Sequence, residues 1–223
     1  PSKEELETEN VIAVVAGATS NLDRHIKNML RFGIPVVVSI NRFASDTDAE
    51  LEAIEEASRA SGASRVCRTE VHSKGGEGGE ALANAVVDSI HDHVAAGRPF
   101  LPLVSPDDTI EKKVEAIATR MYGASNVIFE APALRQLKKI QEWGYGNLPV
   151  CMAKTQYSFS HDAGMLGAPS GFELPVREFR LNAGAGFVVA ILGSIMTMPG
   201  LPKRPAANDM DMDEDGNLVG VFG

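Results

Sequence analysis

The stretch from Phe32 to Phe43 constrains the fold of this chain more than any other segment. A helical run ends at a glycine, an apolar segment rich in β-branched residues covers 34–40, and a polar Asn-Arg pair leads to an aromatic side chain. Short continuous apolar segments are typical of strands buried in a parallel sheet, and such strands deliver functional residues to the loops at their carboxyl ends. The sequence therefore predicts a parallel strand over 34–40 that places Phe43 at a site.

Helices and strands alternate through the first hundred residues. Besides the strand at 34–40, the pattern predicts these elements: a helix over 4–31 broken at 17–20 with Ser20 as an N-cap, helices over 48–60 and 79–96, and a second strand over 65–71. The helix over 79–96 has its apolar residues on one side: Leu82, Val86, Val87, Ile90 and Val94. Such alternation implies parallel pairing with right-handed crossovers, so we expect an α/β domain over 1–98.

Prolines between 97 and 106 disfavour both helix formation and the hydrogen bonds of a β-ladder. They mark a boundary to a second domain over 99–223. This domain is expected to contain the following elements: helices starting at 107 and over 132–143, strands over 127–129, 148–154, 172–181 and 187–192, and a hairpin over 212–221 around an Asp-Gly turn. The predicted fold class is α/β, a three-layer parallel or mixed sheet unit followed by a smaller α+β unit with a C-terminal hairpin.

Composition narrows the class of partner. A net charge of -9 and a pI near 5.1 argue against a nucleic-acid partner, because no basic surplus is present to neutralise phosphates. No apolar run reaches the roughly 18 residues that predict a membrane span, and the polar start is not a signal peptide, so we expect no membrane partner and a cytoplasmic protein. Cys67 and Cys151 are expected to be reduced core thiols, and no metal site is predicted. Without an initiator Met, the chain is expected to be part of a longer one.

A glycine-rich segment over 71–80 is the first candidate for chemistry. Four glycines between a strand end and a helix start allow backbone N–H groups to approach a ligand, and Lys74 adds a full positive charge beside Gly75 and Gly76. An anionic ligand group and a flexible crossover turn are equally good interpretations. The segment is not a Walker loop, because the lysine precedes the glycines and the chain contains no Gly-Lys-Ser/Thr.

Phe43 and His72 each follow a predicted strand, and one helix separates those strands. If the strands are neighbours, the two rings share one rim and can sandwich a flat heterocycle. In the alternative interpretation, which the residues alone slightly favour, Phe43 folds onto the core and His72 is a solvated turn residue.

Four further features are weaker candidates for chemistry. The segment 152–160 gathers Lys154, Tyr157 and several hydroxyls, which suits either a polar substrate or an ordinary loop. The glycines of 182–186 precede a strand rather than a helix, which excludes a dinucleotide loop. The acidic run 211–216 lacks the glutamate of a calcium loop, and His91 and His93 are two residues apart on a helix and cannot share a face.

Several long strings, in order, closely resemble formate–tetrahydrofolate ligases. They are the following segments: 32–43 with 45–47, 74–79, 146–158, 177–178, 183–187 and 196–202. The resemblance covers nearly all 223 residues and corresponds to about the carboxyl-terminal two-fifths of the family's enzymes. It implies an enzyme that uses ATP with Mg²⁺ to convert formate to formyl phosphate, after which N10 of tetrahydrofolate attacks that anhydride and releases phosphate. It also implies a homotetramer, activation by monovalent cations, and a phosphate-binding loop in an amino-terminal domain that this segment does not contain.

The resemblance also implies roles for particular residues. The family stacks the pterin ring between a phenylalanine, which matches Phe43, and a tryptophan, which matches His72; Ala44 stands where relatives have proline. Lys74, Gly75 and Gly76 are expected to face the same cleft, and no catalytic residue is assigned. The segment is thus predicted to supply the folate side of the enzyme and to be inactive alone. The alternatives are a stand-alone folate-binding or subunit-interaction module, such as half of a split enzyme, and a dinucleotide-dependent oxidoreductase, which the missing glycine fingerprint disfavours.

Overall fold

The computed structural model describes residues 8–193, 195, 203–214, 216 and 218–220. The chain divides into two compact units, 1–193 and 194–223, and each is described by itself. Among the described residues, no helix combines the length and the apolarity that crossing a bilayer requires.

Residues 8–98 form an α/β arrangement around two parallel strands, β1 (Val37–Asn41) and β2 (Arg65–Thr69). The register pairs Val37 with Arg65 and Asn41 with Thr69, so both strands end at the same edge. The helices of this part are α2 (Val11–Gly17), α3 (Asp23–Leu30), α4 (Asp48–Ala60), the short α5 (Val71–Lys74) and α6 (Glu80–Ala95). The predicted parallel pairing of the two strands is confirmed.

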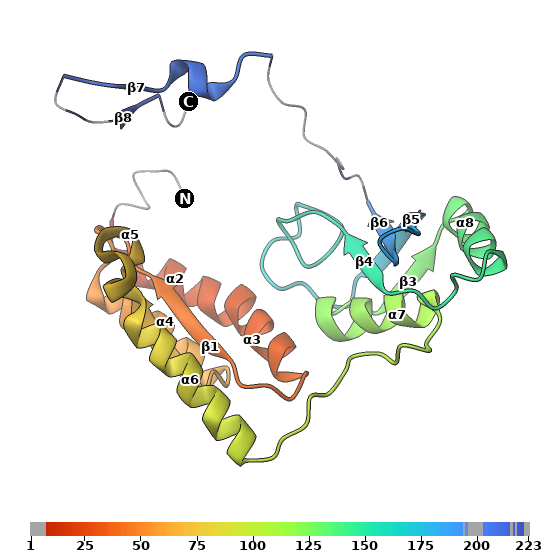
Figure 1. Cartoon of the computed structure of the whole chain (residues 1–223), viewed down its shortest axis with the longest axis horizontal. Helices are drawn as coiled ribbons and strands as arrows, with labels where there is room; N and C mark the ends of the chain where they lie inside the picture. Colours follow the sequence, from red (N-terminus) through yellow and green to blue (C-terminus); the bar gives the residue numbers. More distant parts are fainter. Residues whose placement is uncertain (1–7, 194, 196–202, 215, 217, 221–223) are drawn as a thin grey trace. The chain divides into compact units, whose positions relative to one another are not determined.

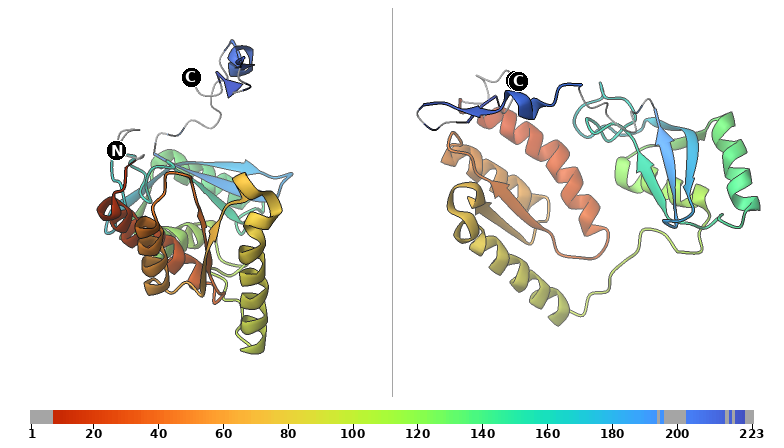
Figure 2. Two further views of the ribbon diagram at one scale, coloured as in Figure 1. Left: turned by 90° about the vertical axis from the view of Figure 1, so that its left-hand side faces the viewer. Right: turned by 45° about the horizontal axis from the view of Figure 1, so that its top comes forward.

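Side chains of β2 alternate between two helical layers. Arg68 forms ion pairs with Glu55 and Asp48 of α4, at 2.6 and 3.0 Å. Arg65 lies three residues earlier in β2 and therefore on the other face of the sheet, where it donates to Ser89 of α6 at 3.0 Å. The sheet thus lies between α6 on one side and the α2–α4 layer on the other (Figure 2), which is the predicted three-layer arrangement.

Three predictions about the first helical segment and strand are wrong. Residues 11–30 form a continuous helix in which α2 passes into α3 through a π-helical turn over 18–22, so there is no break. Ser20 is not an N-cap, because its hydroxyl donates to the carbonyl of Ala16, one turn earlier, at 2.7 Å. The strand begins at Val37 instead of 34, which follows from Pro35, since proline has no N–H to donate to a ladder.

Helix α6 is present where it was predicted, but its apolar side does not pack on the sheet. Ala85 and Ser89 are the buried residues of this helix. The larger aliphatic side chains are exposed by 40% to 70%: Val86, Val87, Ile90 and Val94. Small side chains let the helix approach β2 closely, and the Arg65 hydrogen bond to Ser89 fixes that orientation.

Residues 110–192 form a mixed four-stranded sheet of order β3-β5-β6-β4, with helices beside it (Figure 1). Its elements are α7 (Ile110–Ala116), continued by a π-helical turn over 117–122, β3 (Asn126–Phe129), α8 (Ala131–Glu142), β4 (Val150–Ala153), β5 (Glu173–Asn182) and β6 (Phe187–Leu192). β5 pairs antiparallel with β6, and the two outer pairs are parallel. Leu174, Val176 and Val188 are fully buried beneath α7 and α8, and they centre the core.

The remaining predictions concern the chain end and the thiols. β7 (Asp211–Met212) and β8 (Leu218–Val219) pair antiparallel, which confirms the C-terminal hairpin. Both cysteines are free, as predicted, but Cys151 is exposed and Cys67 is half-buried, so neither is a core thiol. The predicted boundary at 98/99 falls in a segment without helix or strand between α6 and α7, and it stays a prediction. Residues 1–7 and 196–202, named in the sequence analysis, lie outside the described residues.

Candidate functional site

A cavity of about 540 Å³ opens at the carboxyl ends of β1 and β2. Its lining comes from the last residue of β1 and from the segments that follow the two strands: Asn41, Arg42, Phe43, Ala44, Glu70, His72 and Ser73. Because the strands are parallel and paired, both segments begin at one edge of the sheet. The structure thus brings Phe43, Ala44 and His72 to one cavity from separate segments.

The ring of Phe43 is held out from the protein by its own loop. The Phe43 N–H donates to the Asp46 carboxylate at 2.7 Å, and the Asp46 N–H donates back to the Phe43 carbonyl at 3.1 Å. Directly behind this turn, Thr47 and Glu50 form a capping box that fixes the start of α4. The side chain is 64% exposed, so the interpretation in which Phe43 folds onto the core is wrong.

His72 is exposed and lies in the short helix α5, not in a turn. Glu70 precedes this helix, and its carbonyl accepts the N–H groups of Ser73 and Lys74 at 3.1 and 2.9 Å. These bonds close the helical turn that carries the imidazole. The ring is therefore presented from an ordered backbone beside the cavity.

The glycine cluster following α5 has a packing role that the sequence did not reveal. Residues 75–79 form a 3₁₀ helix, and the Gly78 carbonyl accepts the Glu70 N–H at 3.1 Å. A Cβ atom on Gly78 would lie 2.5 Å from the carbonyl carbon of Glu70, so no side chain fits there. Gly75 has a φ of +58°, in the left-handed region that favours glycine. The cluster thus fixes the backbone that carries Glu70 and His72.

Among the described residues, the cavity lining does not include Lys74, Gly75 or Gly76. The Lys74 ammonium instead forms an ion pair with Glu70 at 2.6 Å. The hydrogen bond from Lys74 lowers the pKa of the Glu70 carboxyl, partial desolvation opposes this, and the charges of Lys74 and Arg42 lower it further. Glu70 is therefore ionised at neutral pH. A ligand role for the lysine and the two glycines stays a prediction.

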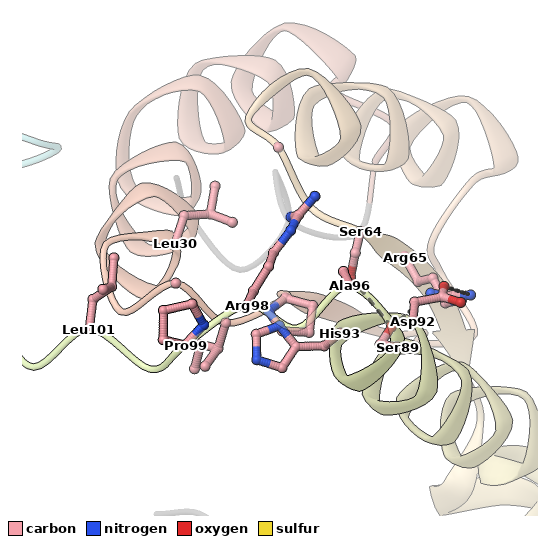
Figure 3. Close-up of a pocket in the computed structure, with 14 residues that line it drawn as sticks. Leu30, Ser64, Arg65, Ser89, Asp92, His93, Ala96, Arg98, Pro99 and Leu101 are labelled. Carbon is pink, nitrogen blue, oxygen red and sulfur yellow. Dashed lines mark hydrogen bonds and ion pairs between the residues drawn. The ribbon is translucent and has the colours of Figure 1, made fainter.

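A second cavity, of about 420 Å³, lies at the opposite, amino-terminal end of β1 and β2 (Figure 3). Helices α3, α4 and α6 all end beside it, so the negative ends of their dipoles give it partial negative charge. Arg65, paired with Asp92 at 2.8 Å, and Arg98 supply positive charge there. These positive side chains already balance the negative helix ends. The cavity at Phe43 is therefore the better candidate for a ligand.

The polar loop after β4 satisfies its own hydrogen bonds. The Lys154 ammonium donates to the carbonyls of Thr155 and Ser158 and lies 5.3 Å from the centre of the Tyr122 ring. Desolvation lowers the pKa of Lys154. Ser158 and Ser160 are buried and bonded to each other at 3.0 Å, whereas Tyr157 is 64% exposed. These contacts favour the interpretation of 152–160 as a structural loop.

The glycine segment 182–186 leads into a strand, as the sequence predicted. Residues 182–186 form the turn that joins the antiparallel strands β5 and β6. In the described part of the chain, no group of three or more His, Cys, Asp or Glu side chains is arranged to hold a metal ion.

Comparisons with known proteins identify the family of this chain. The family model described as "Formate--tetrahydrofolate ligase" matches residues 1–222. Proteins of that name from Staphylococcus aureus strains JH9 and Newman are each 49% identical over 221 residues, which is 99% of this chain. The chain belongs to the formate–tetrahydrofolate ligase family. It spans 39% of the length of these curated relatives.

Four residues that line the cavity of this formate–tetrahydrofolate ligase segment were not predicted from the sequence: Asn41, Arg42, Glu70 and Ser73. Asn41 and Arg42 were noted as a polar pair but not assigned to the site. Glu70 was assigned to a strand, although β2 ends at Thr69. The Glu70–Lys74 spacing of four residues was an available signal, since such pairs meet on one face of a helical turn.

Proposed function

We propose that this chain forms the folate side of a formate–tetrahydrofolate ligase and that the cavity between Phe43 and His72 takes the pterin ring of tetrahydrofolate. The observation that carries the proposal is a 64% exposed Phe43 ring on the lining of the cavity that His72 also lines. Exposed aromatic side chains on a fixed backbone offer flat faces to a flat ligand. A volume of about 540 Å³ lies within the usual range for small-molecule sites.

The complete reaction that we propose needs groups from outside this segment. ATP, with Mg²⁺, phosphorylates formate to formyl phosphate and leaves ADP; N10 of tetrahydrofolate then attacks the formyl carbon and releases phosphate. No Gly-Lys-Ser/Thr phosphate loop occurs in this sequence. We therefore assign the binding of ATP and Mg²⁺ to the part of the family's enzymes that this segment does not contain. A tetrameric, cytoplasmic enzyme activated by a monovalent cation belongs to the same proposal.

The pterin site is tested by titrating the Phe43→Ala variant with tetrahydrofolate in a calorimeter. Loss of stacking and of buried ring area is expected to weaken binding by roughly 1 to 2 kcal/mol, about 5- to 30-fold. Trp143→Ala is a matched control, because that ring is 61% exposed and lies after α8, away from the cavity lining. Unchanged affinity in Phe43→Ala would remove Phe43 from the site.

The partner ring is tested by enlarging it. His72→Trp is expected to tighten tetrahydrofolate binding, because an indole offers a larger face for stacking than an imidazole. Weaker binding in this variant, with the fold intact by circular dichroism, would contradict a sandwich between residues 43 and 72.

The proposal that this chain binds folate but lacks the ATP site is tested with the purified 223-residue chain. We expect it to bind tetrahydrofolate without ATP-dependent formylation. A stand-alone folate-binding or subunit-interaction module would behave in the same way by itself. The two are distinguished by adding the separately produced remainder of a family enzyme, which restores formylation only if this chain is the folate side of the ligase. Turnover by the chain alone would overturn the proposal.

A further inference from the structure

Glu70 is the carboxylate among the residues that line the cavity at Phe43. Its backbone is fixed on both sides: the N–H donates to the Gly78 carbonyl at 3.1 Å, and the carbonyl accepts from Ser73 and Lys74. The hydroxyl of Ser73 adds a further bond to the same carbonyl at 3.2 Å. The close approach of Gly78 prevents this segment from shifting toward the glycine turn. The position of the Glu70 backbone at the edge of the cavity is therefore fixed.

The carboxylate of Glu70 retains capacity for a ligand. Lys74 donates to one oxygen, Oε2, at 2.6 Å, and a carboxylate offers about four acceptor positions on its two oxygens. The side chain is 34% exposed, so solvent or a ligand can reach it. Lys74 keeps the group negatively charged while leaving most of these acceptor positions open.

A pterin presents a matching edge. Its pyrimidine ring carries an N3–H next to a 2-amino group, and these two N–H donors point the same way, as in a guanidinium. A single carboxylate accepts such a pair in two parallel hydrogen bonds, which gives both affinity and orientation. The stacking rings recognise the faces of the heterocycle but not its edge, so a separate group has to fix its rotation within the stack.

We propose that Glu70 binds the N3–H and 2-amino edge of the pterin and so determines the specificity and the orientation of the ring between Phe43 and His72. This inference rests on the proposed function of the cavity. Lys74 then acts as a positioning residue, since it touches Glu70 and lies outside the cavity lining among the described residues. The competing explanation is that Glu70 and Lys74 form a helix-stabilising ion pair without a ligand.

The test changes the ligand and the protein together. Dissociation constants are measured by calorimetry for tetrahydrofolate and for its analogue with a methyl group in place of the 2-amino group, with the unaltered chain and with Glu70→Gln. The unaltered chain is expected to prefer tetrahydrofolate by at least about tenfold, the order of one charge-assisted hydrogen bond. Glu70→Gln is expected to lose most of that preference by weakening tetrahydrofolate binding and changing binding of the methyl analogue little.

Two controls keep the test specific. Glu77→Gln makes the same charge change in the neighbouring 3₁₀ helix, outside the lining, and is expected to leave both dissociation constants unchanged. Thermal unfolding of each variant reports any loss of structure, which would weaken both ligands alike. Two results would overturn the assignment of Glu70. One is equal dissociation constants for the two ligands in the unaltered chain, and the other is an undiminished preference for tetrahydrofolate in Glu70→Gln.

Failure of this inference is distinguishable from failure of the proposed function. If Phe43→Ala weakens both ligands to the same degree while Glu70→Gln leaves the preference intact, the pterin site stands and Glu70 has only a structural role. If the unaltered chain binds neither ligand, the proposed function is overturned together with the role of Glu70.

Discussion

The two α/β parts of residues 8–193 differ in how they hold their shape. The core cluster, centred on Leu174, Val176 and Val188, lies wholly within 110–192. Residues 8–98 bury few apolar side chains: Ala18, Ile26, Ile40, Leu51 and Ala85. The candidate site belongs to residues 8–98, the thinly packed part. Its geometry therefore depends on directed contacts, the Thr47 capping box and the Gly78 approach to Glu70, more than on close packing.

The largest expected difference between the parts is in the cost of core truncation. Leu174→Ala is expected to lower the free energy of unfolding by about 3 to 5 kcal/mol, because a fully enclosed cavity remains, whereas Leu51→Ala is expected to cost about 2 to 3 kcal/mol where sparser surroundings can relax. Both leucines are at most 1% exposed, so the pair is matched. Urea titrations followed by circular dichroism measure the costs, and an equal or larger cost at Leu51 would break the comparison.

The next effect concerns alkaline pH and the 110–192 part. Desolvation, with a smaller contribution from the charge of Cys151, raises the pKa of Tyr122 to about 12. An unfolded tyrosine titrates near 10, so between pH 10 and about 12 the unfolded chain loses this proton while the folded chain keeps it. The stability present below pH 10 is then lost as pH rises, by up to roughly 2 to 3 kcal/mol.

This alkaline loss is measured by comparing urea midpoints at several pH values in the unaltered chain and in Tyr122→Phe. The phenylalanine variant is expected to show a flatter pH dependence, because it lacks the titrating hydroxyl. Tyr157→Phe, at a 64% exposed position, is the control and should keep the original slope. A decline of the same size in Tyr122→Phe would show that other groups cause it.

Local sequence patterns predicted the elements that depend on local contacts. The helix over 48–60 and the strand over 187–192 have the predicted bounds, because a capping box defines the first and a continuous apolar run the second. Phe43 and His72 were placed at one edge because parallel strands share the direction of their ends. The site's physical location could thus be predicted, although its ligand stays a proposal.

Contacts distant in sequence set the features that were missed. The order β3-β5-β6-β4 depends on which strands pair, and short apolar segments do not encode that choice. Glu70 is held at the site by a hydrogen bond from its N–H to the carbonyl of Gly78, eight residues later, which spacing alone did not indicate. The apolar stripe of α6 correctly predicted a helix but not which side packs, because Ala85 and Ser89 allow a closer approach than valine does.

Helix caps give a smaller and matched test. Thr47→Ala is expected to cost about 1 kcal/mol, because it removes the acceptor for the Glu50 N–H and breaks a reciprocal capping box. Thr109 caps α7 by accepting the Lys112 N–H at 3.4 Å without the reciprocal bond of a capping box, so Thr109→Ala is expected to cost about half as much. Thermal unfolding measures both. A larger cost at Thr109 would contradict the view that residues 8–98 depend more on directed contacts.

The smallest expected effect is on the outer side of α6. Val94 is 70% exposed, so Val94→Lys removes little buried area and is expected to change the free energy of unfolding by less than about 0.5 kcal/mol. Val114→Lys, at a fully buried position of α7, places a charge in the core and is expected to cost several kcal/mol or to prevent folding. Urea titration measures both variants. A loss of more than about 1 kcal/mol in Val94→Lys would mean that this side of α6 is covered in solution. Because a covered helix adds packing to residues 8–98, that result would weaken the contrast between the two parts.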